Sequence, residues 1–222
     1  MRTAEIGHLL KLELLLDMRQ KHALGGSLLY VVSAVYICQL AMRRIIDVPV
    51  WNALFWIILL FVAFNALSRS FQREDAGRQL YVHTLVSPRN VVLARMLYNV
   101  AVMLLLGLTC LIFYVVLIGD GALQQARMDL FVLAIVLGAA GFASVLTLIS
   151  AIAARAGSGI GLMAILGFPL VIPMLLSVMR ASKLALDGIG FEASGRYFLG
   201  LLAIDLLTAA LAWILFPYLW RD

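Results

Sequence analysis

The sequence predicts an all-α membrane protein with six transmembrane helices, and two observations support this prediction. The first is composition: the 222 residues are 64% hydrophobic and only 13% charged, whereas soluble domains are about half apolar and about a quarter charged. A water-soluble fold of this length leaves much of its surface exposed and cannot bury so many apolar side chains. The second is distribution, because the apolar residues gather in six runs that approach the roughly 20 residues needed to cross a bilayer.

The six runs cover residues 24–42, 50–67, 91–118, 130–154, 160–179 and 198–220. The third run is long enough to tilt in the bilayer or to extend beyond it. Aromatic residues near several ends, among them Trp51, Tyr98 and Trp220, suit the headgroup level of a membrane. We therefore expect one domain over residues 1–222, surrounded by the lipid bilayer.

The basic residues predict how the chain is oriented in the membrane. If the runs alternate in direction, eleven Lys and Arg residues lie on the side that carries both termini, and six lie on the other. Because Lys and Arg are enriched in cytoplasmic segments, we expect both termini and the segment 68–90 in the cytoplasm. The eleven are Arg2, Lys11, Arg19, Lys21, Arg69, Arg73, Arg78, Arg89, Arg95, Arg155 and Arg221, and the six are Arg43, Arg44, Arg127, Arg180, Lys183 and Arg196.

Residues 1–23 predict a helix that lies along the cytoplasmic surface of the membrane before the first span. At helical spacing, residues 5–18 form an apolar face and a charged face. This stretch is too short and too charged to cross, and such helices lie in the plane of the interface. The alternative is a plain helical extension of the first span. The apolar residues are Ile6, Leu9, Leu10, Leu14 and Leu16, interrupted by His8, Lys11, Glu13 and Asp17.

No motif in the sequence predicts catalysis or a metal site. The phosphate loop GxxxxGK[ST] and the HExxH motif are both absent, so we expect no catalytic residues and no ATP bound by this chain through such a loop. The histidines His8, His22 and His83 are scattered, and Cys38 and Cys110 lie in separate apolar runs, which predicts small core residues and no metal site. The net charge of +5 comes from residues that flank the runs, so it does not indicate nucleic-acid binding.

A few polar residues fall inside the spans, namely Gln39, Asn65, Asn99 and Asp205. Asp205 is the costly one, about a third of the way into the last run. Acids within spans usually face a bundle interior or a water-filled path. Two interpretations stay open: a polar lining group or helix anchor, or an acid near enough to the interface to be hydrated.

Two features concern helix shape. Pro169 and Pro173 lie four residues apart in the fifth run, and each removes a backbone donor, so we expect a kink or an interruption there. The kink would either permit movement or be fixed by packing. In the fourth run, the stretch GAAGFAS from Gly138 to Ser144 has small residues at helical spacing, which predicts close contact with a neighbouring helix.

The segment 68–90 is long and charged for a connection between two spans. Arg69, Arg73, Glu74, Asp75 and Arg78 are followed by the apolar residues Leu80, Tyr81, Val82, Leu85 and Val86. Pro88 would end a helix at Val86 or Ser87. We expect a short helix across the cytoplasmic mouth, placed to receive force from an ATPase, and the alternative is an ordinary juxtamembrane loop.

Three stretches also resemble a known family. The run RSFQREDAGRQLYVHTLVSPRNVVLARMLYN, the segment LTLISAIAARAG and the stretch LMAILGFPLVIPMLL are similar to the haem-exporter permease B family (CcmB) of the cytochrome c maturation system. The resemblance covers most of the chain. It implies a non-catalytic permease subunit of an ABC transporter in the bacterial inner membrane, with segment 68–90 as the coupling segment. The positions it marks there are Arg73, Glu74, Asp75, Gly77, Arg78, Ser87 and Pro88, although Arg78 and Gln79 stand where many members have an acid.

The resemblance also implies partners and a cargo. A separate cytoplasmic subunit would bind ATP, and a second permease copy or a haem-handling membrane protein would complete the complex. A haem chaperone would work with it, and haem would be a cargo of the complex. Two other functions remain open on the residues: a secondary transporter that couples to protons through Asp205, and a membrane scaffold that assembles other proteins.

Overall fold

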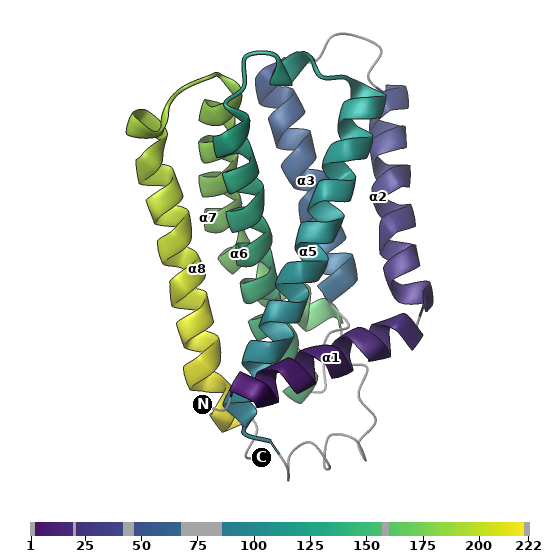
Figure 1. Cartoon of the computed structure of the whole chain (residues 1–222), viewed down its shortest axis with the longest axis vertical. Helices are drawn as coiled ribbons and strands as arrows, with labels where there is room; N and C mark the ends of the chain where they lie inside the picture. Colours follow the sequence, from purple (N-terminus) through teal and green to yellow (C-terminus); the bar gives the residue numbers. More distant parts are fainter. Residues whose placement is uncertain (1–2, 20, 42–46, 68–85, 157–159, 220–222) are drawn as a thin grey trace.

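The computed structural model describes residues 3–19, 21–41, 47–67, 86–156 and 160–219. Within these residues the chain is entirely helical apart from short turns (Figure 1). The α-helices are α1 (Thr3–Arg19), α2 (Lys21–Ala41), α3 (Val48–Leu67), α5 (Pro88–Ile118), α6 (Met128–Arg155), α7 (Ile160–Leu186) and α8 (Phe191–Leu219), with a 3-10 turn, η1, at Gly121–Leu123. The all-α prediction is therefore confirmed.

Five of the described helices, α3 and α5 to α8, are long and apolar enough to cross a membrane. The apolar part of α2 is shorter, at Gly25–Ala41, so the count of six spans stays a prediction. Helix α2 runs alongside the other five, whereas α1 lies across one end of the bundle (Figure 1). A short helix placed crosswise at a bundle end fits the surface helix expected from residues 1–23.

Both ends of the bundle are defined by helix termini. The start of α1, the start of α5 and the end of α8 lie at one end, and the turns at residues 119–127 and 187–190 lie at the other (Figure 1). Gly188 adopts a φ of 74°, and a Cβ there would lie 2.7 Å from the carbonyl oxygen of Gln125. The Arg127 amide donates to the Ala185 carbonyl at 2.8 Å, which joins the two turns. This second end is called the turn end below.

The core is centred on α6, which packs against α3, α5, α7 and α8. Toward the turn end it is filled by buried aromatic rings. Trp51 meets Tyr114 edge-on, with 4.7 Å between ring centroids, and the Tyr114 hydroxyl donates to the Trp51 carbonyl oxygen at 3.0 Å. Cys110 and Cys38, which the sequence predicts as small core residues, are both free thiols. Cys110 is buried and Cys38 is half-buried.

The small residues of α6 allow neighbouring helices to approach closely, as the sequence predicted. A Cβ on Gly138 would lie 2.6 Å from the ring of Trp56 in α3 and 3.1 Å from Val178 in α7. A Cβ on Gly141 would lie 2.5 Å from Asp205 of α8 and 2.7 Å from Met174 of α7. These two glycines therefore let three helices pack against one face of α6.

The close contact at Gly138 yields a prediction about stability. Gly138→Ala should destabilise the protein by about 1–3 kcal/mol, because the Trp56 ring is buried and cannot move away without strain. Gly107→Ala is the matched control: its Cβ would meet Ile135 at 3.5 Å, an ordinary contact, and alanine favours a helix. Thermal unfolding in detergent checks both variants. Equal losses in Tm would contradict the packing described here.

Candidate functional site

The charged segment 68–90 joins the bundle at the start of α5. Ser87 is extended, with φ −67° and ψ 136°, and Pro88 is the first residue of α5. Proline suits this position because its missing N–H would have no intrahelical partner there. Pro88 thus begins helix α5. The short helix that we expected before it, in segment 68–90, falls on residues outside those that the structure describes. Arg73, Glu74, Asp75, Gly77 and Arg78 also lie outside them, so their coupling role stays a prediction.

Three acids of α1 bind the first turns of α5. Glu5 accepts from the Asn90 side-chain amide at 2.7 Å, Glu13 accepts two bonds from the Arg95 guanidinium at 2.9 and 3.1 Å, and Asp17 accepts from the Tyr98 hydroxyl at 2.6 Å. The side chain of Arg95 is only 4% exposed and that of Glu13 is 22% exposed. These pairs hold α1 across the bundle at the point where the charged segment ends.

The pairs correct one detail of the expected α1 surface. Glu13 and Asp17 were expected on a charged face separate from the leucines. Instead, their bonds to α5 place them on the protein-facing side, where Leu9 also packs. Leu12, Leu14 and Leu15 are 40–51% exposed, so the outward face carries leucines together with His8 and Lys11. The acids turn inward because partners on α5 offset the cost of their burial.

Helices α6 and α8 meet the same region. Leu9 of α1 packs against a buried apolar cluster formed by α5, α6 and α8, which includes Val91, Met96, Leu148 and Phe216. The guanidinium of Arg89 lies 4.4 Å from the ring centre of Trp213 in α8, a distance typical of cation–π contacts. We call this contact region of α1, residues 88–98 of α5, Leu148 of α6, and Trp213 and Phe216 of α8 the α5 junction.

The predicted polar residues of the spans have different surroundings. The Asn99 amide donates to the Thr147 hydroxyl at 2.7 Å, which links α5 to α6 in the turn next to the junction. Asn65 is exposed on α3, so it does not line the interior.

Asp205 is buried in α8. Because α8 begins at Phe191, Asp205 lies at the middle of that helix. It stands about a third of the way into the apolar run 198–220 because Glu192 and Arg196 exclude the first turns of α8 from that run.

The two prolines of the fifth run do not interrupt their helix. Helix α7 continues from Ile160 to Leu186 with Pro169 and Pro173 inside it, and both prolines are exposed. They therefore lie on the outer surface of α7 and do not line the space between helices. A kink at this place stays a prediction.

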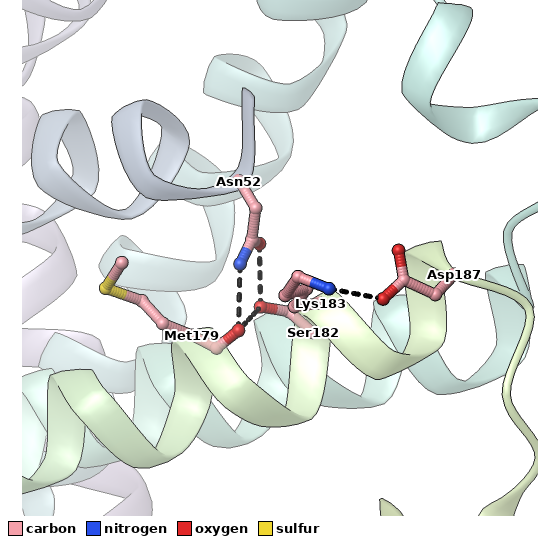
Figure 2. A network of polar contacts seen from close by, with 5 residues as sticks. All are labelled: Asn52, Met179, Ser182, Lys183 and Asp187. Carbon is pink, nitrogen blue, oxygen red and sulfur yellow. Dashed lines mark hydrogen bonds and ion pairs between the residues drawn. The ribbon is translucent and has the colours of Figure 1, made fainter. Parts of the chain in front are cut away.

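A second polar cluster, which the sequence did not indicate, joins α3 to α7 at the turn end. Figure 2 shows Asn52 of α3 donating to the Met179 carbonyl at 2.8 Å, with its amide oxygen 2.8 Å from the Ser182 hydroxyl. The Trp56 ring N–H also donates to Ser182 at 2.8 Å. Asn52 is the third residue of the second run, close to an expected membrane surface. A polar residue is ordinary at such a position, so nothing in the sequence indicated that Asn52 joins two helices. Its 2% exposure makes it an anchor between α3 and α7.

These helices define a multi-pass helical membrane protein whose polar side chains join helices and do not form a reactive centre among the described residues. The chain matches the model of the CcmB protein family over residues 4–217, and it therefore belongs to that family. This confirms the resemblance. Family members are membrane components of the haem-exporter ABC system of cytochrome c maturation, a complex that includes an ATP-binding partner. No curated protein matches the chain.

The Arg95–Glu13 pair yields a prediction about the junction. Arg95→Met should destabilise the protein by about 3 kcal/mol, near the low end of the range for removing one partner of a buried pair, because Glu13 keeps some contact with water. Lys183→Met is the control, since Lys183 and Asp187 form an exposed pair worth about 0–1 kcal/mol. Thermal unfolding and trypsin cleavage at Lys11 report the effect. If both variants match the wild type, Arg95 does not hold α1.

Proposed function

We propose that this chain is the permease subunit that converts ATP hydrolysis by a separate cytoplasmic subunit into movement of the haem-delivery complex. The observation that carries this proposal is the α5 junction. The charged segment 68–85 leads through Ser87 and Pro88 directly into the place where α1, α5, α6 and α8 meet. A push on that segment would act at the start of α5, a 31-residue helix.

The contacts of the junction supply a route for that movement. The acids of α1 are bonded to Asn90, Arg95 and Tyr98, so α1 and the first turns of α5 would move together. Arg89 reaches Trp213 of α8, and Asn99 reaches Thr147 of α6. Displacement of α5 would therefore be passed to α6 and α8. The chain itself would catalyse nothing, and the partner subunit would bind the ATP.

A mechanical role suits this chain better than ligation of haem iron. His8 is exposed on α1 at the end of the bundle, and neither of the other histidines of the sequence, His22 and His83, falls in an apolar run. A ligand to haem iron along the spans would therefore have to be Met, Cys or Tyr, which are weaker or less usual choices than histidine. We propose that haem is a cargo of the complex, which also includes a haem chaperone and either a second permease copy or a haem-handling membrane protein.

We further propose that both termini face the cytoplasm and that the protein lies in the bacterial inner membrane. The basic bias of the sequence supports this orientation. The end of α8 and the start of α5 lie at one end of the bundle, opposite the turn at residues 119–127 (Figure 1).

Reporter fusions test this orientation. A fusion after Asp222 and one within residues 120–127 should report opposite sides of the membrane, with the first in the cytoplasm. A fusion within residues 187–190 is a further control and should agree with the second. Reports from the same side for Asp222 and residues 120–127 would contradict the three spans, α6 to α8, that are expected between these two points.

Charge reversal tests the coupling segment. Glu74→Lys combined with Asp75→Lys should reduce pull-down of the ATP-binding subunit and reduce cytochrome c maturation, because like charges set against a partner cost several kcal/mol. Membrane levels should not change, since exposed charges contribute only about 0–1 kcal/mol to stability. Arg73→Glu should have the same effect if the segment is a charged docking face.

The matched control is the same charge change at the other end of the bundle. Asp120 and Glu192 are both exposed at the turn end, and reversing them to lysine should leave the pull-down intact. Normal pull-down and full maturation in the Glu74 and Asp75 double variant would identify segment 68–90 as an ordinary loop. Loss of ATP-dependent turnover without loss of assembly of the complex would separate this coupling function from that of a membrane scaffold.

A further inference from the structure

A buried acid lies at mid-height in the bundle, far from the α5 junction. Asp205 is at the middle of the 29-residue helix α8, Gly141 is at the middle of the 28-residue helix α6, and Met174 is at the middle of the 27-residue helix α7. The three residues meet, since a Cβ on Gly141 would lie 2.5 Å from an Asp205 carboxyl oxygen and 2.8 Å from the Met174 sulfur. The acid is therefore held where α6, α7 and α8 touch, at mid-height in the bundle.

Nothing in the described part of the chain hydrogen-bonds to this carboxyl group. Asp205 is only 8% exposed, and both of its carboxyl oxygens are buried without a hydrogen-bond partner among the described residues. The neighbouring Thr208 hydroxyl donates to backbone carbonyls of its own helix, at Ile204 and Asp205. At this contact α6 offers a glycine and α7 offers the Met174 thioether, and neither can balance a negative charge.

The charged groups on the helices around α8 are engaged or placed elsewhere. On α5, Arg95 is bonded to Glu13 and Arg89 stacks on Trp213. On α6, Asp129 and Arg155 are exposed at opposite ends of the helix. On α7, Arg180 is exposed and Lys183 pairs with Asp187 near the turn end. None of these described groups forms an ion pair with Asp205.

A carboxylate in this position would carry a full charge with no hydrogen-bond donor or basic partner among the described residues. Burying an ionised group costs far more than burying a neutral polar group, and acids within spans are generally tied to function. A proton is the one ligand that removes the charge and needs no additional space beside Gly141. We propose that Asp205 is a proton-binding site, occupied while α6, α7 and α8 are packed as in this structure.

The site would couple proton binding to helix packing. Separation of α8 from α6 would admit water to the carboxyl group and allow the proton to leave, and closure would require the proton to return. The described parts of the spans place no second acid or histidine at mid-height beside Asp205, so the site would hold a proton without passing it along a relay. This differs from the proton-coupled transporter suggested as an alternative by the sequence.

Infrared difference spectroscopy tests the protonation state directly. The spectrum of wild-type permease in lipid at neutral pH, minus that of Asp205→Asn, should contain the C=O stretch of a protonated carboxylic acid, and this band should shift in D₂O. Asp129→Asn is the control: Asp129 is exposed and paired with Arg127, so its difference spectrum should contain carboxylate bands instead. If the wild-type minus Asp205→Asn spectrum contained carboxylate bands and no band of a protonated acid, Asp205 would be ionised and the proposal would be overturned. A change of those carboxylate bands on adding Na⁺ or K⁺ would identify a cation site.

A second experiment tests the geometry independently of any spectrum. Gly141→Ala should lower the Tm, because its methyl group would collide with the carboxyl group and Met174. Combining it with Asp205→Ala should recover at least half of that loss, since the shorter side chain frees the space. No recovery in the double variant would mean that the carboxyl group does not lie against Gly141, and the proposed site would fall with it.

Discussion

A lipid bilayer offers no water to hydrogen-bond with buried polar groups, so the protein must satisfy them itself. This constraint explains where the polar side chains of the bundle lie. At one end the acids of α1 bind Asn90, Arg95 and Tyr98, and at the turn end Asn52, Trp56 and Ser182 bind one another. Between these ends the spans pack through aromatic rings and glycines. Asp205 departs from this pattern, because both of its carboxyl oxygens are buried without a hydrogen-bond partner among the described residues. This is why we propose that it binds a proton.

The two polar ends differ in what they can do. The cluster at the turn end joins α3 to α7 through short bonds between buried groups, and it suits a fixed point. The α5 junction joins a crosswise helix to the first turns of a long span, with Glu13 still partly exposed. It adjoins the charged segment 68–90, the part of the chain proposed to receive force from an ATPase. Movement applied at the junction, with the turn end held, would tilt α5 against its neighbours.

Much of the fold follows from apolar runs alone, because a span must be continuously apolar over its length. The runs located every long helix, but they missed the polar turns by which α7 extends to Leu186 and α8 begins at Phe191. The tertiary pairs could not be predicted in the same way. Glu5, Glu13 and Asp17 share one side of α1, yet only the crossing of α1 over α5 shows which residues they bind. The sequence did not indicate Asn52 as an anchor, because it lies close to an expected membrane surface. The surroundings of Asp205 could not be predicted either, because they are formed by three helices that are distant in sequence.

The central claim is that α1 and the start of α5 move as one body when the ATP-binding subunit acts. Distances between spin-label pairs, with Cys38 and Cys110 replaced by alanine, measure this directly. One pair joins Lys11 of α1 to Leu97 of α5, and the other joins Lys11 to Ile165 of α7, all of which are exposed. When a non-hydrolysable ATP analogue binds the complex, the Lys11–Leu97 distance should stay constant while the Lys11–Ile165 distance changes. A changed Lys11–Leu97 distance with an unchanged Lys11–Ile165 distance would contradict the account.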